Sequence, residues 1–286
     1  MATEPIDLFH LGHERVIGVY LLETPDGAAL LDCGPRTSVA ALVRGLLEHG
    51  LELTDVRHLL LSHIHLDHAG AAGTLVRRHP RLQIHVSEVG APHLVDPSRL
   101  ITSARRLYGD DFDRTWGEPE PVPAESVHVA GDRVAGLACF PAPGHASHHV
   151  CYLADDGLLY AGDAAGVRIL PGSHILPAAP PPDIDLEGWE RTFAEMERRA
   201  PSALALIHFG VVDAVEAHLE RARATLATWA DRVRRGLSKD EWVAAARADL
   251  VADEGKDGAA HAERAAPLEQ SYAGLARYWR KRREAA

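Results

Sequence analysis

Apolar and polar residues alternate in short blocks through the first part of the chain, and the blocks end at Gly, Pro or Asp. Blocks of this length are typical of β-strands joined by turns, whereas an apolar residue at every third or fourth position predicts a helix. Pro25-Asp26-Gly27 lies between two such blocks and predicts a hairpin. The strands expected on this basis cover residues 16–24, 28–33, 59–62 (ending at His63), 83–87, 126–129, 136–141, 149–154 and 158–161.

Helices are expected between and after these strands. The first covers residues 38–49, and the second follows His63 and runs to about Arg78. Residues 91–123 mix short helical stretches with Pro, Asp and Trp, as an insertion that caps a site would. Two β-rich halves with outer helices predict an α/β chain folded as an αββα sandwich.

The last hundred residues are helical in pattern. Apolar spacing predicts helices over 186–200, 213–235 and 238–283, and Gly255-Lys256-Asp257-Gly258 divides the last of these into two. We therefore expect a main domain over residues 1–235 and a C-terminal helical extension over residues 236–286 that packs on it. Before these helices, residues 169–183 hold five prolines, which exclude regular structure. This loop either lines a substrate cleft or serves as a plain connector.

Composition narrows the range of partners. The chain has 286 residues, 46% of them hydrophobic, which is enough for a large core, and its formal net charge is −11. This charge argues against nucleic acid as the routine partner. Residues 277–283 are basic with interleaved aromatics, which suits nucleic acid or acidic lipid. The overall acidity favours the alternative, an amphipathic terminal helix with Leu275, Tyr278 and Trp279 packed inward.

No segment approaches the roughly 18 consecutive apolar residues that a membrane span needs. The first residues, Met1-Ala2-Thr3-Glu4-Pro5, have neither the basic nor the apolar region of a leader peptide. We therefore expect a cytoplasmic protein without a membrane partner. Cys33, Cys139 and Cys151 are an odd number without metal-ligand spacing, which predicts reduced, mostly buried thiols.

The run His63-Ile64-His65-Leu66-Asp67-His68 carries the chemistry. It places four side chains that can bind metal within six residues, directly after an apolar segment. In an extended chain His63 and His65 point to the same side. Neutral imidazoles favour cations such as zinc or ferrous iron, and a carboxylate reduces the net charge of a second ion beside the first. Burying these groups without a metal would be costly, so the run predicts a metal site.

One loop does not complete such a site, and further candidates lie downstream. His145, Asp163 and His208 each follow the end of an apolar segment. Because strand ends meet at one rim of a sheet, these three side chains are expected at the same rim. Each alone has a plainer explanation, since a Gly-Asp pair is more often a turn.

Taken together, these four motifs resemble those of the metallo-β-lactamase-fold hydrolases, from about Leu8 to His218. The resemblance implies a four-layer αββα sandwich with extra C-terminal helices. It also implies two divalent metal ions, zinc first and iron or manganese as alternatives. In the family the first ion takes the positions of His63, His65 and His145. The second takes those of Asp67, His68 and His208, and the position of Asp163 bridges the two.

The resemblance also implies a mechanism. A hydroxide shared by the two ions attacks the substrate, so no serine or cysteine nucleophile is required. Asp67 would orient that hydroxide or carry its proton to the leaving group. Ligating imidazoles need hydrogen-bond acceptors behind them, or the same polar groups reach substrate instead. The candidates for these supporting roles are Asp32, Ser62, His148, His149, Arg168 and His174.

Departures from the family patterns narrow the substrate. Gly166 stands where similar lactonases carry a tyrosine, and Arg168 alone matches the basic cluster of glyoxalase II. Asp163 argues against a β-lactamase, and His65 argues against the diiron flavoproteins. We therefore expect a member of the glyoxalase II and lactonase-like branch that hydrolyses a thioester or lactone of a small organic substrate. A phosphodiesterase, or a non-catalytic metal-bearing sensor, are the alternatives, and the chain is a candidate homodimer.

Overall fold

The computed structural model describes residues 4–285, which group into two compact units. Within the described residues, unit 1 comprises 4–141 and His148–Asp156, and unit 2 comprises Ala142–Ser147 and 157–285. The predicted domain boundary after residue 235 stays a prediction. The expectation about a leader peptide falls partly on Met1, Ala2 and Thr3, which lie outside the described residues.

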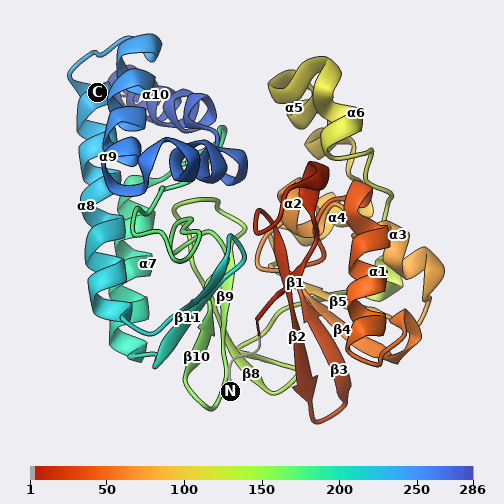
Figure 1. Cartoon of the computed structure of the whole chain (residues 1–286). Coiled ribbons are helices and arrows are strands. Elements are labelled where there is room, and N and C mark those ends of the chain that lie inside the picture. The colour runs from red at the N-terminus through yellow and green to blue at the C-terminus, as the bar shows by residue number, and fades with distance from the viewer. Residues whose placement is uncertain (1–3, 286) are drawn as a thin grey trace. The chain divides into compact units, whose positions relative to one another are not determined.

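Unit 1 is built on a six-stranded sheet whose strands follow the chain order (Figure 1). Its first three strands are antiparallel, and β3 to β6 run parallel. The predicted hairpin is confirmed, because Thr24 pairs with Gly27 across the turn. The strands are β1 (Ile6–Asp7), β2 (Gly18–Thr24), β3 (Gly27–Leu31), β4 (Val56–Leu60), β5 (Gln83–Val86) and β6 (Val127–Val129).

Helices of unit 1 bury their apolar residues beside this sheet. The predicted first helix is α1 (Val39–Glu48), which contacts β1 of this sheet. The second was predicted as one helix but consists of α2 (Leu66–Ala69) and α3 (Ala72–Arg78). The reason for the break is a tertiary hydrogen bond: Ala71 N donates to Gly34 O at 2.9 Å.

The insertion after β5 contains α4 (Ala91–Val95), α5 (Ser98–Tyr108) and α6 (Phe112–Thr115), as its composition predicted. Unit 1 also holds three antiparallel strands, β7 (Arg133–Val134), β8 (Leu137–Pro141) and β9 (Val150–Leu153). The side chain of Tyr152 on β9 is fully buried, and its hydroxyl donates to Leu61 O at 3.0 Å. This bond ties β9 to the segment that follows β4.

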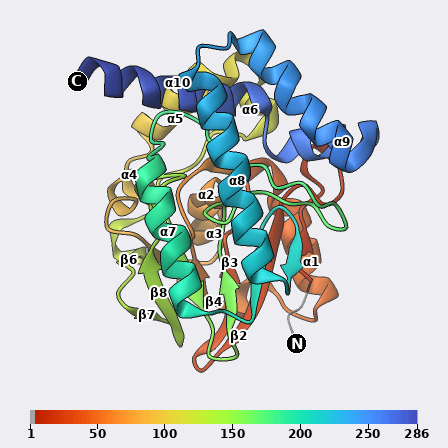
Figure 2. The ribbon, with the colours of Figure 1, turned by 90° about the vertical axis from the view of Figure 1, so that its left-hand side faces the viewer.

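Unit 2 contains a parallel pair, β10 (Leu158–Tyr160) and β11 (Ala203–Leu206), and β12 (Gly210–Val212) returns antiparallel to β11. The strand β12 was not predicted, because three residues that begin with glycine carry no strand pattern. Figure 2 shows α7 (Leu186–Arg199) and α8 (Val215–Arg234) side by side.

The C-terminal segment forms α9 (Lys239–Ala265) and α10 (Leu268–Ala285). The predicted interruption is present, since Gly255 has a φ of 71° inside α9. The gap between α9 and α10 was not predicted. Leu275 and Tyr278 are buried, and Trp279 donates from Nε1 to Ala230 O at 2.9 Å, as expected of an amphipathic terminal helix.

Two further expectations concern the whole chain. The three cysteines are free and buried, as predicted, and burial raises the pKa of the Cys33 thiol far above its ordinary value. Among the helices of residues 4–285, none combines the length and the apolar character needed to cross a membrane.

Candidate metal centre

The histidine-rich run begins after the end of β4. The strand was expected to continue to His63, but its ladder ends at Leu60. Ser62 N donates to Oδ1 of Asp32 at 2.7 Å instead of to a neighbouring strand. The chain therefore leaves the sheet at Ser62, and the following residues form a loop and the short helix α2, on which Asp67 and His68 lie.

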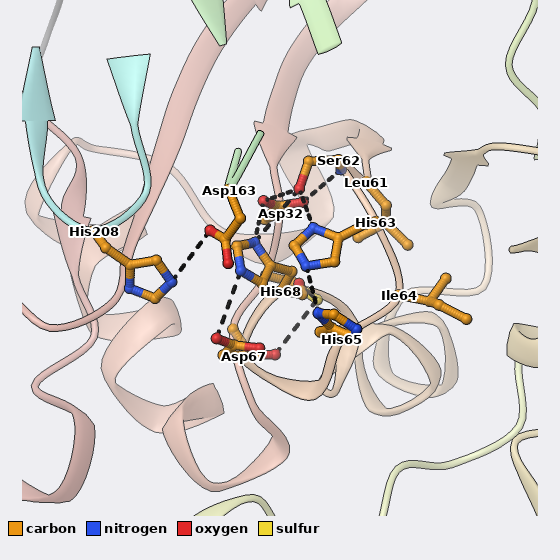
Figure 3. A network of polar contacts seen from close by, with 12 residues as sticks. Asp32, Leu61, Ser62, His63, Ile64, His65, Asp67, His68, Asp163 and His208 are labelled. Atoms are coloured by element: carbon orange, nitrogen blue, oxygen red, sulfur yellow. Dashed lines mark hydrogen bonds and ion pairs between the residues drawn. The ribbon is translucent and has the colours of Figure 1, made fainter. Parts of the chain in front are cut away.

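A buried carboxylate organises this loop (Figure 3). Asp32 is fully buried, has a left-handed φ of 59°, and accepts hydrogen bonds from Ser62 N, from Ser62 Oγ at 2.8 Å and from His68 Nδ1 at 2.8 Å. Because a carboxylate only accepts, His68 carries its proton on Nδ1. Its Nε2 then presents a lone pair, which is the form that binds metal.

Ser62 fixes the position of the ring proton of His63 as well. Its single hydroxyl proton is used on Asp32, so its oxygen accepts from His63 Nδ1, 3.0 Å away. The lone pair of His63 is thereby placed on Nε2. That atom lies 2.9 Å from Nδ1 of His65, which is close enough for both ring nitrogens to bind the same metal ion. His63 and His68 are fully buried, whereas His65 and Asp67 are half-buried.

His148 and His149 lie in unit 1 beside this run. The His149 ring stacks on His63 with centroids 4.8 Å apart, and His148 is edge-on to His65 at 5.3 Å. Nδ1 of His148 accepts from Ile64 N at 3.4 Å. Their observed contacts therefore pack and orient the run, and their expected role in contacting substrate stays a prediction.

In unit 2, His145 lies in a segment held by α7. Gly144 has a φ of 139°, and a Cβ there would lie 2.4 Å from Trp189 Cα, so only glycine permits this approach. Thr192 donates to Pro143 O at 2.6 Å. The His145 ring is buried and donates from Nδ1 to Ala178 O at 2.7 Å, which leaves Nε2 as its acceptor nitrogen.

Asp163 lies between two imidazoles of unit 2. Its Oδ2 is 3.6 Å from His145 Nε2. Its Oδ1 is 3.5 Å from His208 Nε2 (Figure 3). Asp163 and His208 are both nearly fully buried. One carboxylate thus presents a separate oxygen to each ring, an arrangement that suits a bridging ligand.

These separations test whether the residues fit a metal. Zinc binds nitrogen and oxygen at about 2.0–2.2 Å, so two donors on one tetrahedral ion lie roughly 3.4 Å apart. The donor pairs within each unit lie between 2.9 and 3.6 Å apart. Neutral imidazole nitrogens backed by acceptors, together with carboxylates, are the donors that zinc, iron and manganese accept. The residues therefore fit divalent metal ions.

The proline-rich loop contains neither helix nor strand within the described residues, apart from a single bridge between Val167 and Leu176. Arg168 is half-buried, its Nε donates to Gly172 O at 2.7 Å, and its backbone N donates to His208 O at 3.0 Å. The Nδ1 atom of His174 lies 2.9 Å from an oxygen of Asp253 on α9. The contacts of Arg168 and His174 are thus structural, and a role toward substrate stays a prediction for both.

Two contributors to this arrangement were not predicted from the sequence. The acceptor for His145 is the backbone carbonyl of Ala178, which no residue pattern marks. Trp189 was missed as well, although its indole is fully buried, donates to Ala164 O at 2.7 Å and lies edge-on to His145. An aromatic residue on an apolar helix face would have been the only signal.

The sequence of this chain is similar to those of known proteins. Residues 15–210 match the family model of the metallo-beta-lactamase superfamily. The uncharacterized protein YobT of Bacillus subtilis is 26% identical over 202 residues, which is 67% of this chain and 82% of YobT. The metallo-beta-lactamase fold-containing protein ST1585 of Sulfurisphaera tokodaii is also 26% identical, over 72% of this chain and 78% of ST1585.

Solved structures show the fold. The structure of ST1585 from Sulfolobus tokodaii superposes with a TM-score of 0.66 at 17% identity and covers 96% of each chain. That of TTHA1429 from Thermus thermophilus gives 0.63 at 21% identity, over 93% of this chain and 89% of the other. TTHA1623 in a di-iron-bound form gives 0.53 at 22% identity, over 73% and 93%. The predicted metallo-β-lactamase fold with added C-terminal helices is confirmed.

The buried carboxylate of Asp32 generates a first prediction. In Asp32→Asn the amide nitrogen cannot accept from Ser62 or His68, so one ring loses its acceptor and its fixed proton position. We expect metal affinity to fall about 10- to 100-fold, as is typical when the partner behind a ligand is lost. Competition with a chromophoric chelator measures this, and Glu48→Gln is the control, because Glu48 is an exposed residue at the end of α1. An affinity equal to that of the wild type would contradict the role given to Asp32.

A second prediction concerns His218 on α8, which braces the turn after Asp163 by contacting Ala165 O at 2.9 Å through Nε2. Burial lowers the pKa of His218 from 6.5 to about 4 in the folded protein. Below pH 6.5 the imidazole is therefore protonated in the unfolded chain, but in the folded chain it stays neutral down to about pH 4. The folded state loses stability relative to the unfolded state as the pH falls through this window.

Between pH 7 and pH 5 this group alone should cost about 2 kcal/mol of the free energy of unfolding. His218→Gln keeps a donor for Ala165 but does not titrate, so its stability should fall less over the same range. Urea unfolding of chelator-treated protein at both pH values measures the difference. An equal loss of unfolding free energy in the two proteins would show that the pKa of His218 is not lowered in the folded state.

Proposed function

This chain belongs to the metallo-beta-lactamase superfamily, and we propose that it is a metal-dependent hydrolase of ester-like bonds, thioester or lactone, in a small organic substrate. The observation that carries the proposal is that hydrogen bonds fix the tautomers of three of the histidines. His63, His68 and His145 each donate from Nδ1 to an acceptor of the protein, so Nε2 is the unprotonated nitrogen, the form in which imidazole binds a metal.

Seven side chains are assigned to two ions. Within unit 1, His63 and His65 share one place, and Asp67 lies 3.6 Å from His68 Nε2. Within unit 2, Asp163 offers one oxygen to each of His145 and His208. We assign His63, His65 and His145 to one ion, Asp67, His68 and His208 to the other, and Asp163 to both, following the family pattern.

When bound, two divalent cations supply Lewis acidity and lower the pKa of a bound water toward 7 from about 15.7. The chain's own residues then have defined tasks. Asp67 is 19% exposed, unlike the fully buried His68 beside it, so its carboxylate can both face an ion and exchange a proton with substrate. Asp32 and Ser62 keep His68 and His63 in the tautomer that leaves Nε2 unprotonated.

Substrate class and metal identity form the finer part of the proposal. A carboxylic ester-like bond needs no basic surface for a polyanion, which agrees with the net charge of −11. Zinc is our first choice on the imidazole-rich donor set. Iron belongs in the same test, because TTHA1623 has been solved in a di-iron-bound form, and manganese accepts the same carboxylates.

The test is metal content per chain on protein purified without added metal, followed by assays on matched thioester, lactone and phosphodiester substrates. We expect close to two metals and turnover of a thioester or lactone. His63→Ala should lower turnover by more than about 100-fold, because losing a ligand costs at least as much as losing its support. Asp67→Asn should lose turnover while retaining the metal of the His63 set.

His13→Ala is the matched control, since His13 is an exposed histidine of the same unit. Turnover of the phosphodiester alone would replace the proposed bond class with that of a phosphodiesterase. A metal-replete protein that turns over none of the three, yet binds one of them tightly, would identify a sensor. Less than one metal per chain, without rescue by zinc, iron or manganese, would contradict the metal site itself.

A further inference from the structure

The His145 imidazole depends on one backbone carbonyl. His145 is 1% exposed, and its Nδ1 donates to Ala178 O at 2.7 Å. Ala178 belongs to the proline-rich loop of residues 169–183, whose described residues form no helix or strand. Beyond the bridge between Val167 and Leu176 the loop has no hydrogen-bond ladder of its own, so contacts with other elements help to place the Ala178 carbonyl.

One end of the loop is held by α9. A single oxygen of Glu254 accepts from Ser173 N and His174 N, each at 2.5 Å, and Asp253 accepts from the His174 ring at 2.9 Å. Both acids directly precede Gly255, where the φ of 71° interrupts α9. The interruption predicted from the sequence therefore coincides with the point at which the helix holds the loop.

The other end is held by α10 at the residue next to Ala178. Ser271 Oγ accepts from Ala179 N at 3.2 Å, and the Ser271 side chain is buried. One turn later, a Cβ at Gly274 would lie 1.9 Å from Ala179 O, so α10 reaches the loop only because this residue is glycine. Further along the helix, Arg277 Nε donates to Pro182 O at 3.3 Å.

We propose that α9 and α10 position His145 through this loop, and that Ser271 and Gly274 thereby set how tightly the metal at His145 is held. The inference rests on the proposed function, in which His145 is a ligand. The matched family region ends at residue 210, so the two helices lie outside the part of the chain that the family model describes. Mutation of a group that hydrogen-bonds a metal-ligating side chain typically changes metal affinity about 10- to 100-fold. We expect effects of this size when α9 or α10 no longer holds the loop in place.

The experiment compares Gly274→Ala and Ser271→Ala with the full-length wild type. Gly131→Ala is the control for adding a methyl group, because a Cβ at Gly131 meets no atom within 4 Å. Three readouts are taken: the zinc dissociation constant by chelator competition, the visible spectrum of the cobalt-substituted protein, and the melting temperature of the metal-free protein. Ser271→Ala keeps the test decisive if Gly274→Ala fails to fold, since it removes only a hydroxyl.

We expect Gly274→Ala to weaken zinc binding by about 10-fold or more and to alter the cobalt spectrum. Ser271→Ala should do the same to a smaller extent, with Gly131→Ala unchanged. Variants that melt at a lower temperature but keep the wild-type zinc affinity and cobalt spectrum would reduce the two residues to a packing role and overturn the inference. A wild-type protein that binds no metal would instead overturn the proposed function on which it rests.

Discussion

The structure depends on the fact that the buried carboxylate of Asp32 must be satisfied by hydrogen bonds. An ionised carboxylate without donors would be too costly at 0% exposure, and here the backbone and hydroxyl of Ser62 and the ring of His68 supply them. Meeting this demand ends β4 at Leu60, fixes where the histidine-rich run begins, and sets the tautomers of His63 and His68. Fold and candidate chemistry share one polar network.

Unit 2 meets the same need by a different route. His145 has no side-chain carboxylate behind it and donates to the carbonyl of Ala178 instead. A carbonyl in an irregular loop is only as well placed as the loop, and the loop is held by Glu254, Ser271 and Gly274 from the C-terminal helices. Unit 1 therefore orients its imidazoles with residues at the ends of neighbouring strands, whereas unit 2 depends on Glu254 and Ser271, which lie 80 and 92 positions after the loop residues that they bind.

The elements that sequence reasoning identified well are those with local causes. The hairpin at Pro25-Asp26-Gly27 and the interruption at Gly255 follow from turn and glycine chemistry, and both are present. The errors have non-local causes. The helix expected to reach Arg78 breaks because Ala71 N bonds to Gly34 O, and β12 exists because β11 offers it a partner. Neither partner can be read from the neighbouring residues.

By itself, the sequence determined the donor types and the order in which they occur, because ligand chemistry is a property of side chains and the run from His63 to His68 is contiguous. It also determined the α/β class, since strand and helix periods are local. Only the tertiary structure decided which ring nitrogen each histidine can offer. That choice depends on an acceptor such as Asp32 or Ala178 O, and it is folding, not spacing along the chain, that brings the acceptor to the ring.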